Sequence, residues 1–434
     1  MKKNNAKDFI VIGFALFAMF FGAGNLIFPP YMGNLVGDKT PIAILGFLIT
    51  GVGLPLTGII ACAKINGSFS DISKRVGKVF SVFATTILVL AIGPMLAIPR
   101  TAATTYELAV HPIFPSVGPS LSVAIYFLIC LIFVLRPSSI IDNIGKILTP
   151  ILFLTLGTII IKGIISPIGP VVNTGFKGVF PSALLEGYQT MDVMASVIFS
   201  SIVLSSIKDK GYTSRKDIIS LTIKSGLVSV VGLAFVYGGL MILGSQTSTV
   251  ISSDIGRSAL VVEIVKSIFG NIGTVILGIS VGLACLTTAI GLISTGASYF
   301  NKLSRGKVSY GTFAIIISVV SALLATGGVD DLVKLAVPIL NVLYPIVIVL
   351  IIITLLGNLV KNNTVVRITV YTTFFVSFFT TIDIQTNGNI TAVNKILSFI
   401  PLNDAGFAWI LPSIIAFVLG MILFERKSSK QWFV

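Results

Sequence analysis

Two short segments of this chain place glycine and polar residues inside long apolar stretches. The first covers residues 22–25 (Gly-Ala-Gly-Asn) and is followed by Pro29 and Pro30. The second covers residues 186–192 and reads Glu-Gly-Tyr-Gln-Thr-Met-Asp. Glycine allows non-helical backbone conformations, and proline removes a helical hydrogen bond. Each segment therefore predicts an interrupted helix whose free backbone groups bind a ligand. A kinked helix in close contact with a neighbour is the alternative.

The ends of the interrupted helices would carry opposite partial charges. In the first segment, a helix that ends near Phe21 leaves carbonyl groups free. A helix that restarts near residues 26–29, where prolines fit a first turn, presents N–H groups to a carboxylate. In the second segment, a helix that ends near Gly187 offers carbonyl groups to an ammonium. A zwitterionic α-amino acid satisfies both ends. The predicted substrate-binding residues are Gly22, Ala23, Gly24, Asn25, Gly187, Tyr188, Gln189 and Thr190.

Two carboxyl groups, those of Glu186 and Asp192, flank the second segment. An ionisable side chain inside a membrane is costly unless it lines a cavity or takes part in transport. Both residues are therefore candidates for an acid that couples transport to protons. Alternatively, Glu186 extends to the outer membrane interface, and Asp192 stabilises the start of the following helix.

Adjacent hydroxyl groups at Thr287 and Thr288 predict a cation site. The two positions lie about 100° apart on a helix, and the Ala284 carbonyl lies one turn before Thr288. With two free carbonyls from the first interrupted helix, they would offer about five neutral oxygen atoms to an alkali cation. The alternative is that both hydroxyls bond a carbonyl one turn earlier in their own helix.

The elements that must position these residues are membrane-spanning helices. Of the 434 residues, 55% are hydrophobic and 11% are charged, whereas soluble domains carry about 25% charged residues. Uncharged runs that can form membrane helices, some with flanking residues, cover 9–37, 40–63, 79–99, 112–135, 147–161, 193–207, 225–253, 267–301, 308–329, 335–360, 368–382 and 405–424. The sequence therefore predicts an all-α polytopic membrane protein with twelve transmembrane helices, in which residues 1–434 form a single membrane domain.

The two interrupted segments belong to the first and sixth of these helices. Because the two helices are five apart, they cross the membrane in opposite directions, as in an inverted repeat. We therefore expect a first five-helix repeat over residues 9–166 and a second, inverted repeat over residues 181–357. Residues 364–424 would add two further helices.

The positive charges indicate how the chain is oriented. With a cytoplasmic N-terminus, 22 of the 30 Lys and Arg residues fall on the cytoplasmic side, in agreement with the positive-inside rule. The other eight, among them Arg100, then fall on the outer side. Both termini are thus predicted to be cytoplasmic. The net charge of +14 reflects this topology, and no basic arm or aromatic groove indicates nucleic-acid binding.

Residues for enzyme catalysis or for a resident metal are sparse. Cys62, Cys130 and Cys285 fall inside apolar runs without ligand spacing, and His111 is the only histidine. No nucleophile–base pair is recognisable in the sequence. We expect no enzyme and no cofactor besides a coupling ion, and nothing in the sequence specifies an oligomeric state.

The glycine-rich motifs carry a resemblance to a known family. Residues 14–30, with Gly-Ala-Gly-Asn at 22–25 and Phe-Pro-Pro at 28–30, resemble the signature of the branched-chain amino acid:cation symporters. Residues 187–192 resemble that family's motif in the sixth helix, and residues 93–100 agree more loosely with the end of its third helix. The resemblance implies a bacterial protein of the cytoplasmic membrane. It also implies import of leucine, isoleucine and valine with sodium or, in some members, with protons.

That family is similar to the five-plus-five inverted-repeat (LeuT/APC-like) fold of sodium-coupled amino-acid transporters. Position by position, the similarity implies a sodium site made by the carbonyls of Ala18, Phe21 and Ala284 and the hydroxyls of Thr287 and Thr288. It implies a secondary active transporter that works by alternating access in a lipid bilayer. The alternatives are a proton-coupled or exchanging carrier of other neutral amino acids and a passive channel or facilitator.

Overall fold

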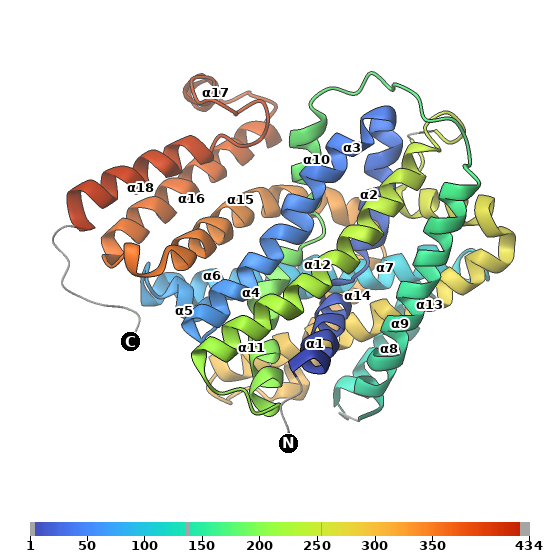
Figure 1. Cartoon of the computed structure of the whole chain (residues 1–434), viewed down its shortest axis with the longest axis horizontal. Coiled ribbons are helices and arrows are strands. Elements are labelled where there is room, and N and C mark those ends of the chain that lie inside the picture. Colours follow the sequence, from blue (N-terminus) through green and yellow to red (C-terminus); the bar gives the residue numbers. More distant parts are fainter. Residues whose placement is uncertain (1–4, 136–138, 253, 426–434) are drawn as a thin grey trace.

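The computed structural model describes residues 5–135, 139–252 and 254–425. Over these ranges the chain is helical and contains no β-strand (Figure 1). The helices are α1 Asn5–Phe20, α2 Gly24–Val36, α3 Thr40–Leu48, α4 Leu54–Ile65, α5 Phe69–Ser73, α6 Lys78–Leu90, α7 Ala97–Thr105, α8 Pro119–Leu135, α9 Ser139–Ile165, α10 Val179–Tyr188, α11 Asp192–Asp209, α12 Arg215–Ser245, α13 Arg257–Leu303, α14 Tyr310–Ala325, α15 Val329–Leu356, α16 Asn363–Gln385, α17 Thr391–Leu397 and α18 Ile410–Phe424. Short π-helical segments, Ile49–Gly53 and Ala91–Met95, join α3 to α4 and α6 to α7, and Tyr106–Val110 extends α7.

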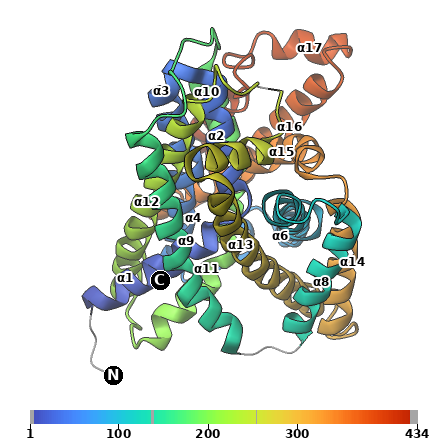
Figure 2. The ribbon, with the colours of Figure 1, turned by 90° about the vertical axis from the view of Figure 1, so that its right-hand side faces the viewer.

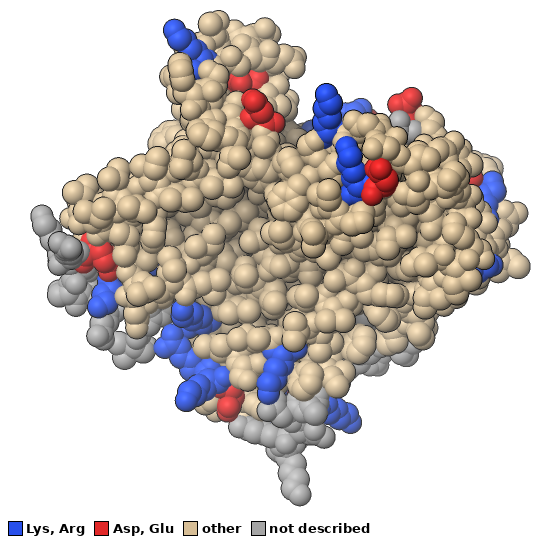
Figure 3. Space-filling model, turned by 45° about the horizontal axis from the view of Figure 1, so that its top comes forward, with Lys and Arg blue, Asp and Glu red and all other residues tan. Residues whose placement is uncertain are grey.

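The composition of these helices identifies an integral multi-pass membrane protein. Seven helical stretches of the described chain are long and apolar enough to cross a membrane: Gly24–Ile65, Lys78–Val110, Val179–Asp209, Arg215–Ser245, Arg257–Leu303, Val329–Leu359 and Asn363–Gln385. Four shorter apolar helices accompany them. Figure 3 shows charged side chains towards opposite ends of the molecule and an uncharged band between them. Large apolar side chains such as Leu154 and Leu323 are exposed, as expected for a surface that lipid covers.

The long helices α12 and α13 hold the predicted site together. α12 packs against α1, α2 and α4, whereas α13 packs against α2, α7, α9 and α14. Figure 2 shows α13 running obliquely through the molecule. At one edge, α16 packs between α15 and α18 (Figure 1). Because α13 contacts both α2 and α7, residues on these three helices are brought to one place.

Reciprocal glycines let α2 and α12 approach closely. A Cβ atom on Gly33 of α2 would lie 2.9 Å from the Ser245 nitrogen and would overlap the Met241 carbonyl. A Cβ atom on Gly244 of α12 would lie 2.8 Å from the Pro30 Cα and would overlap its carbonyl. Small residues at such crossings allow van der Waals contact between helix backbones, which drives helix association in membranes.

The first predicted interruption is confirmed, but the second half of the helix starts earlier than expected. α1 ends at Phe20 and α2 begins at Gly24, so Pro29 and Pro30 lie inside α2 rather than in a first turn at residues 26–29. The Asn25 side chain explains the difference, because its Oδ1 accepts the Gly22 N–H at 2.8 Å. This bond takes the place of the helical bond from Gly22 to Ala18, and the chain turns immediately into α2.

The second predicted interruption is also confirmed. α10 ends at Tyr188, α11 begins at Asp192, and Met191 between them has a φ of 63°. The carbonyls near Gly187 are not free, in contrast to our expectation. The carbonyl of Gly187 accepts the Thr190 hydroxyl at 2.9 Å, and the carbonyl of Tyr188 accepts the Met191 N–H at 3.0 Å. A tight turn therefore satisfies the backbone groups that were predicted to bind an ammonium.

A third interruption, which the sequence did not predict, separates α6 from α7. Gly93 has φ −92° and ψ −120°, and Pro94, which follows it, has no N–H to donate. The chain re-enters a helix at Ala97 and continues to Val110, so Arg100 lies inside the helical region. Arg100, which the charge count assigns to the outer side, therefore lies within α7 and is buried. A charged residue normally marks the end of an apolar run. Arg100 stays within the helix, where its guanidinium donates a hydrogen bond to the Gln189 carbonyl.

The predicted orientation rests partly on residues of the sequence that are not described. Lys2, Lys3, Arg136, Lys146, Arg426, Lys427 and Lys430 lie outside the residues whose side chains are described. Among the remaining basic residues assigned to the cytoplasmic side, Lys64, Arg75 and Arg215 surround one pocket. Their proximity agrees with a common side of the membrane.

Candidate functional site

The three interruptions meet at one small cavity of about 40 Å³. Its polar wall consists of Asn25, Arg100, Thr101, Thr190, Asp192 and Thr288, together with the backbone of residues 22–24. Its apolar wall consists of Met19, Phe20, Ile92, Ala97, Met191, Ala195, Phe199 and Leu292. The cavity has room for about one or two water molecules, so a larger ligand requires the walls to move apart.

Asn25 and Asp192 connect the two predicted interruptions directly. Asn25 Nδ2 donates to Asp192 Oδ2 at 2.8 Å, and it also lies within hydrogen-bonding reach of the Tyr237 hydroxyl. The Tyr237 hydroxyl donates to the same Asp192 oxygen at 2.9 Å. All three side chains are buried. The carboxylate is thus held by α2 and α12 at the first residue of α11, where the helix dipole favours negative charge.

Arg100 places a positive charge on the same cavity. It is 3% exposed, and its Nη1 donates to the Gln189 carbonyl at 2.7 Å. Its guanidinium carbon lies 5.1 Å from the centre of the Phe28 ring. The cavity is therefore lined by one buried basic side chain from α7 and one buried acidic side chain from α11.

The predicted sodium ligands belong to two parts of the chain. Ala18 lies near the end of α1 and Phe21 directly after it, whereas Ala284, Thr287 and Thr288 lie on α13. The hydroxyls of Thr287 and Thr288 both donate to the Ala284 carbonyl, at 2.9 and 3.0 Å, so three of the five predicted oxygens are adjacent. The Thr288 methyl group is 4.0 Å from the position of a Cβ on Gly22. The Ala18 carbonyl is released from its helical partner, as described above. The alternative interpretation predicts the same two hydrogen bonds, because in it both threonine hydroxyls bond a carbonyl of their own helix.

Three of the predicted substrate-binding residues, Gly187, Tyr188 and Gln189, do not line the cavity. A Cβ on Gly187 would overlap the Thr50 hydroxyl, so this glycine allows α10 to pack on the segment that joins α3 to α4. Tyr188 stacks on Tyr344, with ring centres 4.2 Å apart. The backbone carbonyl of Gln189 accepts a hydrogen bond from Arg100. The buried Oε1 of its side chain has no hydrogen-bond partner in the described chain.

Glu186 does not line the cavity and belongs to a cluster of charges. Its carboxylate is 3.5 Å from Arg257, which also donates to Asp330 at 2.9 Å. The Arg257 guanidinium lies 4.1 Å from the centre of the Tyr31 ring and 5.8 Å from that of Phe28. This cluster links α10, α13 and α15, and the centre of the Phe28 ring lies 5.8 and 5.1 Å from the guanidinium groups of Arg257 and Arg100.

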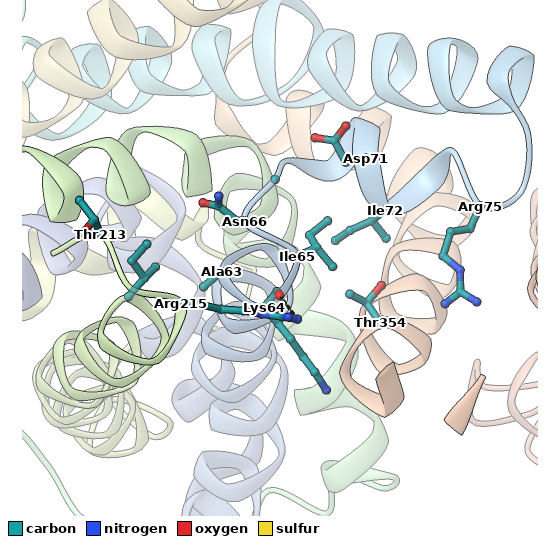
Figure 4. A pocket seen from close by; sticks show the side chains of 12 residues that line it. Ala63, Lys64, Ile65, Asn66, Asp71, Ile72, Arg75, Thr213, Arg215 and Thr354 are labelled. Atoms are coloured by element: carbon teal, nitrogen blue, oxygen red, sulfur yellow. Dashed lines mark hydrogen bonds between the residues drawn. The ribbon is translucent and has the colours of Figure 1, made fainter. Parts of the chain in front are cut away.

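A larger pocket of about 550 Å³ lies at the other end of the molecule. It is formed by α4, α5, the beginning of α12 and Thr354 of α15. Figure 4 shows Lys64 and Arg215 close together, with Arg75 at one side of the pocket. The Arg215 side chain donates to the Lys64 carbonyl at 2.9 Å, and Lys64 donates to the Leu355 carbonyl at 2.6 Å. These bonds tie α4 to α12 and α15 near the cytoplasmic side of the predicted topology.

Sequence reasoning missed two residues of the site, Arg100 and Tyr237. A charge near the end of an apolar run is normally read as a boundary, so Arg100 gave no signal. Tyr237 lies in the middle of a long apolar run next to Gly238 and Gly239. Since a buried tyrosine hydroxyl needs a partner, its central position could have indicated a polar neighbour.

Almost the whole chain is similar to proteins named as branched-chain amino acid transporters. The family described as "Branched-chain amino acid transport protein" matches residues 5–427. The branched-chain amino acid permease BraB of Bacillus subtilis (strain 168) is 38% identical over 429 residues, which cover 96% of this chain and 95% of BraB. The permease BrnQ of the same organism is 35% identical over 442 residues, which cover 99% of this chain and all of BrnQ.

The fold is also that of a solved transporter. The structure of Mhp1, a nucleobase-cation-symport-1 family transporter in a closed conformation with bromovinylhydantoin bound, superposes with a TM-score of 0.62. It covers 95% of this chain and 91% of Mhp1 at 14% identity, which shows a shared fold alone. The relatives of this chain are permeases and not enzymes. Because the family matches residues 5–427, the chain belongs to the branched-chain amino acid transport protein family.

Proposed function

We propose that this protein imports leucine, isoleucine and valine across a bacterial cytoplasmic membrane and couples their entry to sodium. The observation that supports this most is the cavity at the helix interruptions, which combines a buried carboxylate with a largely apolar wall. A zwitterion with an aliphatic side chain fits this combination. The names of the relatives BraB and BrnQ point to the same substrates.

The proposed architecture has twelve crossings. Helices α1 to α9 would form the first five-helix repeat, over residues 9–166, and α10 to α15 the second, inverted repeat, over residues 181–357. Helices α16 and α18 would be the two additional crossings within residues 364–424. The matching interruptions between α1 and α2 and between α10 and α11 support this arrangement, because they meet at one cavity.

Apolar residues of the cavity would receive the substrate side chain. Phe20, Ile92 and Phe199 form part of this wall and belong to three different helices or helix junctions. A single methylene changes binding by only about 1–3 kcal/mol in an apolar pocket. Leucine, isoleucine and valine are therefore expected to compete for one site.

Uptake of radiolabelled leucine into liposomes that contain the full-length protein tests this function. We expect accumulation with an inward sodium gradient, little with a proton gradient alone, and competition by isoleucine and valine. Accumulation that follows the proton gradient and ignores sodium would favour the proton-coupled alternative, for which Asp192, buried and joined to Asn25 and Tyr237, is the strongest candidate acid. In that case the Asp192→Asn protein should no longer accumulate leucine in response to a proton gradient. Equilibration without any gradient dependence would indicate a facilitator.

The proposed sodium site predicts a specific effect of threonine substitutions. The site comprises the carbonyls of Ala18, Phe21 and Ala284 and the hydroxyls of Thr287 and Thr288. Replacing either threonine by valine removes one of about five ligands, a loss of roughly 1–3 kcal/mol. The apparent sodium affinity of leucine uptake should fall by about 5- to 150-fold.

Thr295 provides the matched control for these variants. Its hydroxyl donates to the Gly291 carbonyl at 2.8 Å on the same helix, and the residue is half-buried. The variant Thr295→Val should therefore keep the sodium dependence of the wild type. Unchanged sodium dependence in Thr287→Val and Thr288→Val would show that the hydroxyls only bond their own helix.

The proposed orientation predicts which loops a membrane-impermeant thiol reagent reaches in intact cells. A cysteine at Asn173, in the loop between α9 and α10, should be labelled from outside, whereas a cysteine at Ser214 should not. Both positions are exposed, and the three native cysteines are buried. Labelling at Ser214 in intact cells would reverse the orientation and place the termini outside.

A further inference from the structure

The guanidinium of Arg100 is almost completely buried and has few partners. Its hydrogen bond to the Gln189 carbonyl, 2.7 Å from Nη1, is the only one that it makes within the described chain. Its Nε is buried and has no hydrogen-bond partner. Since arginine carries five N–H donors and remains charged, most of its donors face no acceptor.

No carboxylate neutralises this cation directly. Among the described residues, no Asp or Glu oxygen lies within 4.0 Å of an Arg100 nitrogen. Asp192 is its principal negative neighbour, but Asp192 Oδ2 is held by Asn25 and Tyr237. An unpaired charge in the interior of a membrane protein is costly and usually marks a functional site.

Arg100 lies next to a second group that attracts anions. A Cβ atom on Gly24 would be 2.8 Å from Arg100 Nη2, so the guanidinium lies against the first residue of α2. The N-terminus of α2 has no side-chain cap, and its first two residues, Gly24 and Asn25, line the same cavity. A carboxylate at this point could accept two parallel hydrogen bonds from the guanidinium and further ones from the helix N-terminus.

We propose that Arg100 binds the α-carboxylate of the transported amino acid and that Asp192 accepts its α-ammonium group. The assignment rests on the proposed function and adds a specificity-determining residue to it. It replaces the expected ammonium site near Gly187, where the carbonyls are already bonded. The two charges lie on opposite helices, α7 and α11, and the substrate completes both pairs when the cavity opens to admit it.

Leucinol, in which a hydroxymethyl group replaces the carboxylate, tests the assignment on the purified full-length protein. Titration calorimetry should show that the wild type binds leucine at least about 10-fold more tightly than leucinol. Arg100→Gln should weaken leucine binding by about 10- to 150-fold and leucinol binding by less than about 3-fold. The preference for leucine over leucinol should therefore nearly disappear. Arg100→Lys, which keeps the charge but loses the planar fork, should retain part of it.

Arg75 is the matched control, because it is also a buried arginine whose guanidinium donates to a backbone carbonyl, that of Val360. Arg75→Gln should leave the preference for leucine over leucinol unchanged. Equal losses of leucine and leucinol binding in Arg100→Gln would assign Arg100 a purely structural role and overturn the proposal.

The wild-type titrations decide the proposal even if the Arg100 variants do not fold. A wild type that transports leucine but binds leucinol equally well would overturn the carboxylate assignment and leave the proposed function intact. A wild type that binds no branched-chain amino acid would overturn the proposed function itself and, with it, the assignment.

Discussion

Replacing Gly24 by leucine is expected to abolish leucine uptake while the protein still inserts into the membrane. The added side chain would start 2.8 Å from Arg100 Nη2 and 2.9 Å from the Phe28 ring. Ordinary van der Waals contacts between carbon atoms lie at about 3.5–4.0 Å, so the guanidinium and the ring must move. The side chain would then occupy the cavity between α2 and Arg100. We expect the initial rate of uptake in liposomes to fall by at least about 100-fold, as is common when reacting groups are displaced by about 1 Å.

Gly291 of α13 offers a matched control for this substitution. No atom lies within 4 Å of a Cβ built on Gly291, and the residue is exposed on the outer surface of the helix. Gly291→Leu should therefore transport leucine at close to the wild-type rate. Normal uptake by Gly24→Leu at wild-type protein levels would show that the interruption between α1 and α2 does not form the substrate site.

A single methyl group at Gly244 is expected to disrupt the packing of the whole bundle. In Gly244→Ala the methyl group would overlap the Pro30 carbonyl, so the backbones of α2 and α12 would have to separate. Overpacking typically costs 1–3 kcal/mol, and contacts with backbone atoms relax least. We expect a melting temperature in detergent that is about 1–3 °C lower, with reduced yield of folded protein. Gly33→Ala, on the facing helix, should behave in the same way.

The control for this effect lies on the same helix. At Gly238 the nearest atom to a built Cβ is 3.9 Å away, which is an ordinary contact. Alanine is favoured over glycine in a helix by up to about 1 kcal/mol, so Gly238→Ala should melt at or above the wild-type temperature. A Gly244→Ala protein as stable as Gly238→Ala would show that the close approach of α2 and α12 is not required.

The positions of both main interruptions could be predicted because their causes are local. Residues 22–25 and 186–192 interrupt apolar sequence with glycine and polar groups, and the structure breaks helices there. The prolines predict a helix start near residues 26–29, because proline fits the first turn of a helix, whereas α2 begins at Gly24. The bond from the Gly22 N–H to the Asn25 side chain moves that start forward.

The orientation of the site side chains depends on distant residues and was not accessible from the sequence. Tyr188 does not line the cavity but stacks on Tyr344, which belongs to α15. Arg100 is buried within α7, where the carbonyl of Gln189, more than eighty residues later, accepts a hydrogen bond from it. Such long-range contacts decide whether a charged residue ends a helix or stays within it.

With Asp192 ionised, as the binding of an ammonium group requires, Arg100 and Asp192 together give the cavity no net charge, and a bound zwitterion adds none. Movement of the binding site between the two faces of the membrane would therefore transfer no charge through the electric field. The membrane potential can then act only on the coupling cation, at about 2.3 kcal/mol per charge for each 100 mV. For one cation per substrate, a potential of that size alone would support an accumulation of about 50-fold. Leucine uptake by this protein should accordingly generate an inward current that is carried entirely by the ion.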